Sequence, residues 1–107
     1  NGDAFIDQMI EVYGRRREMV VSTLRALGWA QEPPRGTFYL WVPVPQGHTS
    51  ASFCDHLLES CAVVVAPGAA YGEHGEGFVR FSLAVTDDRL EEAMRRMREQ
   101  LPALVVA

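Results

Sequence analysis

Arg80 is the side chain in this sequence that is best placed to bind a ligand. It lies in an apolar run over 78–83 whose alternation predicts a strand, with Arg80 on the face opposite Val79 and Phe81. A guanidinium on a short strand can bind a planar carboxylate through two parallel hydrogen bonds. The residues alone leave a second interpretation open, an ordinary arginine on a solvated sheet face. The pattern therefore indicates, at most, a carboxylate-binding site.

A glycine-rich loop over 67–77 comes directly before that strand, with four glycines in eleven positions. Glycine lets the backbone approach a ligand closely, so the loop is typical of the rim of an active site. It lacks the helix start and the lysine of a phosphate-binding P-loop, which argues against a phosphate cradle. A plain mobile connection is the alternative that the sequence leaves open.

Other catalytic arrangements find little support in the sequence. His48, His56 and His74 do not have the spacing of metal ligands, and Cys54 and His56 point to different sides of one predicted helix. All ten positively charged residues are arginines. Because the chain contains no lysine, it cannot form a lysine Schiff base by itself.

Length and composition fit one compact domain over 1–107. Hydrophobic residues make up 48% of the chain, which is enough to bury a core. A net charge of −4 argues against nucleic acid or an anionic membrane as the main partner, and no apolar stretch approaches the ~20 residues of a membrane span. Cys54 and Cys61 would lie about 10 Å apart along one helix, too far for a disulfide. We expect free thiols and a cytoplasmic location.

The order of elements is predicted to be α-β-α-β-β-α. Helices are indicated by apolar residues at three- and four-residue spacings, and strands by short β-branched or aromatic runs that end at proline or glycine. Few strands and separate helices predict an α+β two-layer sandwich, in which helices cover a small mixed or antiparallel sheet. The expected helices are 4–27, 50–60 and a last one capped by Thr86 or Asp88 and ended by Pro102; the expected strands are 37–42, 62–66 and 78–83, with a connector over 32–36.

Apolar positions within these elements predict which surfaces are buried. The side of the first helix expected to face inward carries Phe5, Met9, Val12, Tyr13, Val20, Leu24 and Leu27, and that of the second helix carries Phe53, Leu57, Leu58 and Cys61. A fold this small should also leave apolar surface against which another domain docks. The aromatic residues expected in that exposed patch are Trp29, Tyr39, Trp41 and Tyr71.

Five segments, in the right order and at the right spacing, resemble the small domain of class I and II aminotransferases of fold type I. Residues 34–41 and 64–72 are similar to two strands of that domain, 75–83 to the segment with its substrate-carboxylate arginine, and 13–19 and 90–97 to its flanking helices. In chain order the segments read YGRRREM, PRGTFYLW, VVAPGAAYG, GEGFVRFSL and LEEAMRRM. The resemblance covers essentially the whole chain, and the sequence is most similar to the bacterial LL-diaminopimelate aminotransferase-like group.

The resemblance implies a division of labour between two domains. The small domain closes over the substrate, Arg80 anchors the α-carboxylate of an amino acid or 2-oxo acid, and Tyr71 and Gly72 line the entrance. Pyridoxal phosphate is held by a large domain that supplies the Schiff-base lysine and that this sequence does not include. We therefore expect the carboxy-terminal small domain of a pyridoxal-phosphate-dependent aminotransferase, a homodimer when full length and inactive as the fragment alone.

Three alternatives stay open at this point. Another fold type I enzyme, such as a carbon–sulfur lyase, uses a similar small domain. An aminotransferase-like transcriptional regulator would use the domain to sense an effector, and a winged-helix region upstream would favour it. A free-standing binding module would have to cover its hydrophobic face by self-association. Arg80 would read the carboxylate that all amino acids share, so it does not identify the substrate.

Overall fold

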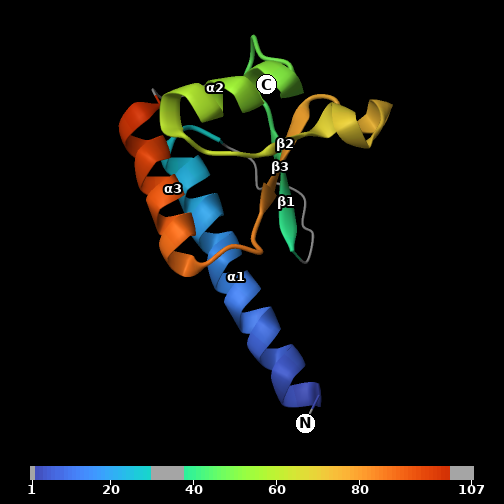
Figure 1. Cartoon of the computed structure of the whole chain (residues 1–107), viewed down its shortest axis with the longest axis vertical. Coiled ribbons are helices and arrows are strands. Elements are labelled where there is room, and N and C mark those ends of the chain that lie inside the picture. Colours follow the sequence, from blue (N-terminus) through green and yellow to red (C-terminus); the bar gives the residue numbers. More distant parts are fainter. Residues whose placement is uncertain (1, 30–37, 102–107) are drawn as a thin grey trace.

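The computed structural model describes residues 2–29 and 38–101 as three helices on one side of a small sheet (Figure 1). The helices are α1 (Gly2–Ala26), α2 (Ser50–Cys61) and α3 (Asp87–Gln100), and the strands are β1 (Tyr39–Pro43), β2 (Ala66–Pro67) and β3 (Phe78–Ser82). Two short 3-10 turns, η1 (Gly68–Tyr71) and η2 (Glu73–Gly75), join β2 to β3. The predicted order and the α+β class are confirmed. The expected connector over 32–36, Thr37 and Pro102 lie outside the described residues.

The sheet is fully antiparallel, with β3 in the middle and the strand order β1-β3-β2. Arg80 therefore has a neighbour on each side, Trp41 of β1 and Ala66 of β2. Alternation gives the sheet two unlike faces. The face toward the helices is buried and carries Leu40, Val42, Val79 and Phe81, whereas the other face carries the half-buried Tyr39, Trp41, Phe78 and Arg80.

The hydrophobic core lies between the buried face of the sheet and the three helices. The second half of α1 contributes Val20, Val21 and Leu24, which are almost completely buried. Phe53 of α2 and Met94 of α3 meet them in the same cluster. Since full burial of one such side chain contributes about 1.5–3 kcal/mol, this packing is what holds the sheet in place.

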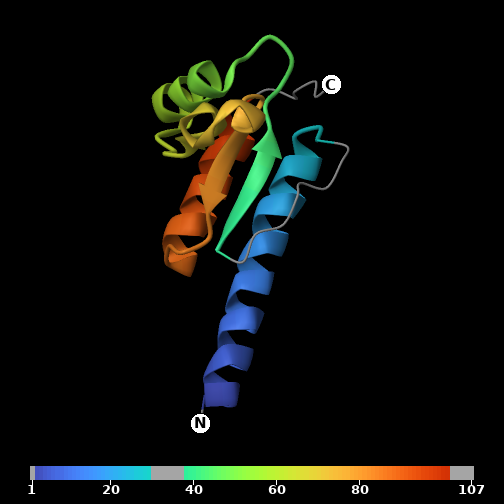
Figure 2. The same ribbon diagram turned by 90° about the vertical axis from the view of Figure 1, so that its right-hand side faces the viewer.

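The first half of α1 extends beyond the rest of the structure (Figure 2). Phe5 was expected in the buried stripe but is 63% exposed, and Ile6 and Ile10 are also exposed. The stripe itself is real, because Val20 and Leu24 further along it are buried. Periodicity identified the apolar side of the helix correctly, but the sheet and α3 reach only its second half.

Two further residues are placed differently from expectation. Leu58 of α2 is 52% exposed, because the inward side of that helix is filled by Phe53, Leu57 and Cys61. Trp29 was expected in the exposed patch but is only 2% exposed. Its indole Nε1 donates a hydrogen bond to the carbonyl of Pro43 at 2.8 Å, which satisfies its polar atom inside the core.

The sequence predicts a buried strand over the valine-rich run 62–66, but only its last residue, the half-buried Ala66, lies in a strand. Ala62 adopts a left-handed conformation with φ of 56° and closes α2, its N–H donating to the carbonyls of Leu57 and Leu58. Val64 then points to solvent and is 81% exposed. Pairing with β3 begins only at Ala66 and continues to Pro67. The start of the predicted strand is therefore taken up by the C-terminal cap of α2.

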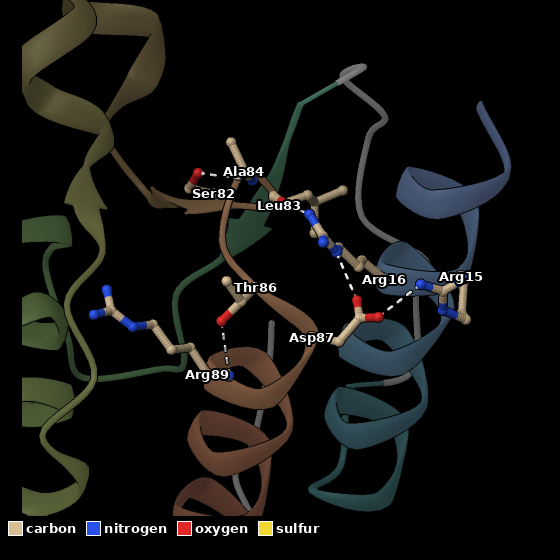
Figure 3. Close-up of polar contacts among 8 residues, drawn as sticks. All are labelled: Arg15, Arg16, Ser82, Leu83, Ala84, Thr86, Asp87 and Arg89. Atoms are coloured by element: carbon tan, nitrogen blue, oxygen red, sulfur yellow. Dashed lines mark hydrogen bonds and ion pairs between the residues drawn. The ribbon is translucent and has the colours of Figure 1, made fainter. Parts of the chain in front are cut away.

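Asp87, at the start of α3, ties that helix to the middle of α1 (Figure 3). Its two carboxylate oxygens accept hydrogen bonds from Arg15 at 2.7 Å and from Arg16 at 2.8 Å. Arg16 also donates to the carbonyl of Leu83, the residue that directly follows β3. Of the two predicted caps, Thr86 and Asp88, the structure selects Thr86, whose hydroxyl accepts from the backbone N–H of Arg89. These contacts join α1, β3 and α3 where they converge.

The hydrogen bonds from Arg16 and Arg15 hold the pKa of Asp87 below its usual value. A depressed folded-state pKa means that the ion pair stabilises the fold above the unfolded-state pKa of about 3.9, and that this stability is lost as pH falls through the folded-state pKa. We expect Asp87→Asn to lower the free energy of unfolding at about pH 7 more than Asp88→Asn does, with the difference shrinking below about pH 4. Urea unfolding between about pH 7 and pH 2 measures both variants.

Asp88 is a matched control because it occupies the same first turn of α3. A carboxylate in that turn stabilises the helix through the positive end of the helix dipole, with or without an arginine partner. Equal losses for the two variants at every pH would show that the arginine contacts add nothing to the helix-terminus effect.

Candidate functional site

The guanidinium of Arg80 contacts two aromatic rings on the half-buried face of the sheet. Its central carbon is 5.0 Å from the ring centre of Tyr39 and 4.6 Å from that of Tyr71, within the range of cation–π contact. Tyr39 comes from β1, where it pairs with Ser82, and Tyr71 ends the η1 turn that follows β2. Two separate segments thus converge on an arginine that belongs to a third, β3.

Trp41 links the two tyrosines. It lies directly opposite Arg80 across the β1–β3 ladder, and its ring is 6.1 Å from Tyr39 and 5.4 Å from Tyr71, centre to centre. Both ring pairs are nearly perpendicular, at 87° and 89°, which is the favoured edge-to-face arrangement. We call Tyr39, Trp41 and Tyr71 the aromatic cluster.

Within the described residues, the guanidinium of Arg80 contacts rings and has no carboxylate or hydrogen-bond partner. Arg16 differs, because its guanidinium is already engaged by Asp87 and by the Leu83 carbonyl. Arg95 likewise bonds Glu92 and Glu99 on α3. A half-buried guanidinium presents five N–H donors in a planar fork, the arrangement that suits a carboxylate. The Arg80 site thus has donors free for an anionic ligand.

Tyr71 is positioned by a turn whose backbone is packed against itself. Gly68 and Gly75 touch so closely that a Cβ on Gly68 would lie 2.6 Å from the carbonyl oxygen of Phe78 and overlap that of Gly75. Only glycine fits at such a backbone crossing. The η1 and η2 turns are held together there, and the position of Tyr71 follows from this contact.

A carboxylate fastens the same turn to α2. Glu76 accepts hydrogen bonds from the hydroxyl of the buried Ser50 at 2.6 Å and from its backbone N–H at 3.2 Å. The Ser50 hydroxyl in turn lies 3.4 Å from the N–H of Ala69 in η1. The hydrogen bonds from Ser50 lower the pKa of Glu76, and the side-chain bond contributes more than the backbone bond. The charged form of Glu76 is therefore the one that anchors the turn.

The structure brings Arg80 and Tyr71 together and places Gly72 next to them. Gly72 has a φ of 110°, which suits glycine alone, and its N–H donates to the carbonyl of Ala69. It forms the joint between the two 3-10 turns. Tyr39 and Trp41 had been assigned to a docking patch and not to the site. Their i, i+2 spacing put them on one face of a strand, but only the register shows that this face is the one with Arg80.

Two cavities bear on the choice of site. One of about 330 Å³ adjoins the aromatic cluster and is lined by Trp41, Tyr71, His74, Gly75 and Phe78. This is near the lower end of the range for small-molecule sites, about 300–1,000 Å³. A larger cavity of about 500 Å³ lies beside α3, and neither Arg80 nor the aromatic cluster lines it. Arg80 itself does not line the smaller cavity, which adjoins the site through Trp41 and Tyr71 of the aromatic cluster.

The described residues contain no other site with clear chemistry. Among them, no group of three or more histidine, cysteine or acidic side chains is close enough to hold a metal ion. Cys54 and Cys61 are free, as predicted, and burial raises the pKa of both thiols, with a smaller contribution from Asp55 at Cys54. Thiols of raised pKa are poor nucleophiles. None of the helices in 2–29 and 38–101 has the length and hydropathy to cross a membrane.

Comparison with known proteins gives consistent matches. A family profile described as aminotransferase class I and II matches residues 1–97. LL-diaminopimelate aminotransferase 2 of Nostoc sp. is 47% identical over 94 residues, which are 88% of this chain and 24% of that protein. The crystal structure of an aromatic aminotransferase from Pyrococcus horikoshii aligns with a TM-score of 0.79 at 38% identity, over 90% of this chain and 26% of that one.

A second solved structure is also similar to the chain. The structure of L,L-diaminopimelate aminotransferase from Chlamydomonas reinhardtii aligns with a TM-score of 0.75 at 31% identity, over 88% of this chain and 23% of that one. The chain thus spans about a quarter of the length of the curated relatives it matches.

Proposed function

The chain belongs to the class I and II aminotransferases, and we propose that it forms the substrate-closing small domain of such an enzyme. In this role Arg80 binds the α-carboxylate of the amino acid and of the 2-oxo acid between which an amino group is moved. The observation that carries the proposal is the half-buried Arg80 guanidinium, which lies over two tyrosine rings with its N–H donors unpaired in the described structure. Tyr71 and Gly72 form the edge of the site.

Anchoring the carboxylate contributes to catalysis by orientation. A bidentate pair with Arg80 fixes two atoms of the substrate, so that rotation about the bond to Cα is the main freedom left. Holding the reacting bond in one orientation accelerates the reaction because the entropy of alignment is lost on binding and not in the chemical step. Every amino acid can make this contact, so Arg80 selects for an α-carboxylate. The side chain of the substrate is then recognised by other parts of the enzyme.

Aminotransferases of this class use pyridoxal phosphate, which supplies an electron sink for chemistry at Cα. The residues of this chain do not fit covalent attachment of that group, since none of its 107 residues is a lysine. We propose that a separate large domain of the same protein holds the cofactor, and that this fragment alone neither holds it stably nor transfers amino groups. Stable, reducible attachment of the cofactor to the isolated chain would contradict this.

Relatives named for LL-diaminopimelate make that amino acid the first donor to test. The full-length protein would be assayed for amino transfer to a 2-oxo acid, with LL-diaminopimelate and a panel of single amino acids. Each amino acid would be compared with the amine of the same side chain that lacks the α-carboxylate. We expect amines to react about a hundredfold or more slowly, because they cannot pair with Arg80.

Two outcomes would replace the proposal by an alternative. Binding of amino acids without transfer, in a protein that also binds DNA, would favour an aminotransferase-like regulator. Release of a sulfur-containing product would favour a carbon–sulfur lyase. Equal rates for amino acids and amines would show that no carboxylate anchor operates.

The remaining parts of the proposal concern partners and location. We place the chain in a homodimeric full-length enzyme, in contact with its own large domain. The half-buried sheet face and the exposed apolar residues of α1 support this, since both leave surface for a further domain. The two free thiols support a reducing, cytoplasmic location.

A further inference from the structure

We propose that Tyr39 and Tyr71 are positioning residues that act through Arg80, stacking on its guanidinium so that its N–H edge is presented to the carboxylate. The inference rests on the proposed function, because it assumes that Arg80 binds a carboxylate. It adds a specific mechanism by which two residues outside the ion pair determine how well that ion pair forms.

The first support is that the two rings reach the same guanidinium from different segments. Tyr39 belongs to β1 and its ring centre is 5.0 Å from the guanidinium carbon, and Tyr71 belongs to η1 and is at 4.6 Å. Arg80 belongs to β3, which pairs with β1 on one side and with β2, the strand that leads into η1, on the other. An arginine side chain on a strand face has several rotatable bonds and is otherwise costly to order. Contacts with two rings restrict it before any ligand arrives.

The second support is that stacking uses none of the hydrogen-bond donors. A flat guanidinium packs its face on a ring and leaves the N–H groups, which lie in its plane, available. Arg16 shows the contrast within the same chain. Its guanidinium lies 5.6 Å from the Tyr13 ring centre, but its edge is already bonded to Asp87 and to the carbonyl of Leu83. Arg80 has comparable aromatic contacts and no such partner in the described residues.

The third support is that the tyrosine rings are themselves held. Trp41 packs edge-to-face against each of them, at 5.4 Å from Tyr71 and 6.1 Å from Tyr39. The η1 turn that carries Tyr71 is fixed by the Gly68–Gly75 backbone contact. The rings therefore provide a preorganised support, and the ordering cost that Arg80 would otherwise pay on binding is reduced.

The test uses the full-length protein and LL-diaminopimelate as the probe, with kcat and KM measured separately. Tyr39→Leu and Tyr71→Leu each remove one ring, and we expect each to raise KM by about three- to thirtyfold with a smaller change in kcat. Tyr71→Phe keeps the ring and should recover most of the loss. Tyr13→Leu is the matched control, since it removes a tyrosine–arginine contact away from the site, and it should leave KM unchanged.

A double-mutant cycle separates action through Arg80 from a direct contact with the substrate. If the tyrosines act only through Arg80, then Tyr71→Leu added to Arg80→Ala should cost nothing more than Arg80→Ala alone. A further loss in the double variant would overturn the inference, as would Tyr39→Leu and Tyr71→Leu both leaving KM unchanged. If Arg80→Ala itself has no effect, the proposed function has failed. If only Arg80→Ala has an effect, the carboxylate anchor stands and the positioning role of the rings is wrong.

Discussion

Replacing Arg80 with alanine in the full-length enzyme is expected to lower kcat/KM for its amino acid substrate by about a hundred- to a thousandfold. If Arg80 binds the α-carboxylate as proposed, the substitution removes two charge-assisted hydrogen bonds, each contributing about 1.5–3 kcal/mol, and water offsets part of that loss. The substrate would then bind weakly and without a fixed orientation, so both KM and kcat should worsen. Steady-state amino transfer from LL-diaminopimelate to a 2-oxo acid measures the change.

Two control variants separate this effect from charge and from folding. Arg89→Ala removes the same charge at an exposed position on α3, outside the aromatic cluster, and should stay near wild type. Arg80→Lys keeps the charge but loses the planar fork and the stacking on Tyr39 and Tyr71, so we expect it to recover only a small part of the activity. An Arg80→Ala enzyme within about threefold of wild type would refute the carboxylate anchor.

The orientation of Arg80 could be predicted from the sequence because it depends on a local rule. Residues two apart on a strand share a face, so the apolar Val79 and Phe81 assign Arg80 to the opposite side. The structure confirms this, with Val79 and Phe81 buried and Arg80 half-buried. The cap of α3 at Thr86 was predictable for the same reason, since capping involves only neighbouring residues.

The surroundings of Arg80 could not be predicted, because they depend on register and on turn geometry. Nothing in the spacing of Tyr39 and Trp41 states which residue of β3 they oppose, and a shift of one residue would have put them on the other face. Tyr71 reaches Arg80 only because the glycine-rich stretch folds into two 3-10 turns and not into an open loop. The sequence indicated the arginine, and the fold supplied its neighbours.

Burial was predicted well where a helix packs along its whole length and poorly where it does not. Val20 and Phe5 belong to the same apolar stripe of α1, yet one is buried and the other exposed, because the stripe extends past the sheet. Trp29 is buried because its indole N–H reaches the Pro43 carbonyl, a contact between segments that no local pattern encodes. Periodicity reports which side is apolar, and only tertiary contacts decide how much of that side is covered.

Gly68→Ala is expected to be the most destabilising single change in the turn, with a loss of about 3 kcal/mol in the free energy of unfolding. The added Cβ would overlap the carbonyl oxygen of Gly75 and lie 2.6 Å from that of Phe78. Both obstacles are backbone atoms, so neither can move aside as the tip of a flexible side chain would. Relief requires separating η1 from η2, which also displaces Tyr71 from Arg80.

Gly14→Ala makes the same chemical change in a place with free space and should have the opposite sign. Gly14 lies inside α1, and nothing would come within 4 Å of a Cβ there. Alanine is favoured over glycine in a helix interior by about 0.5–1 kcal/mol, so this variant should be more stable than wild type. Urea unfolding of Gly68→Ala, Gly14→Ala and Gly75→Ala measures these changes in the free energy of unfolding. Gly75→Ala is included because its Cβ would meet the backbone of Gly68 at the same crossing. If Gly68→Ala and Gly75→Ala each cost less than about 1 kcal/mol, the two turns can separate easily. The backbone crossing would then not be what holds Tyr71 against Arg80, and the fixed support that we infer for the guanidinium would have to come from Trp41 alone.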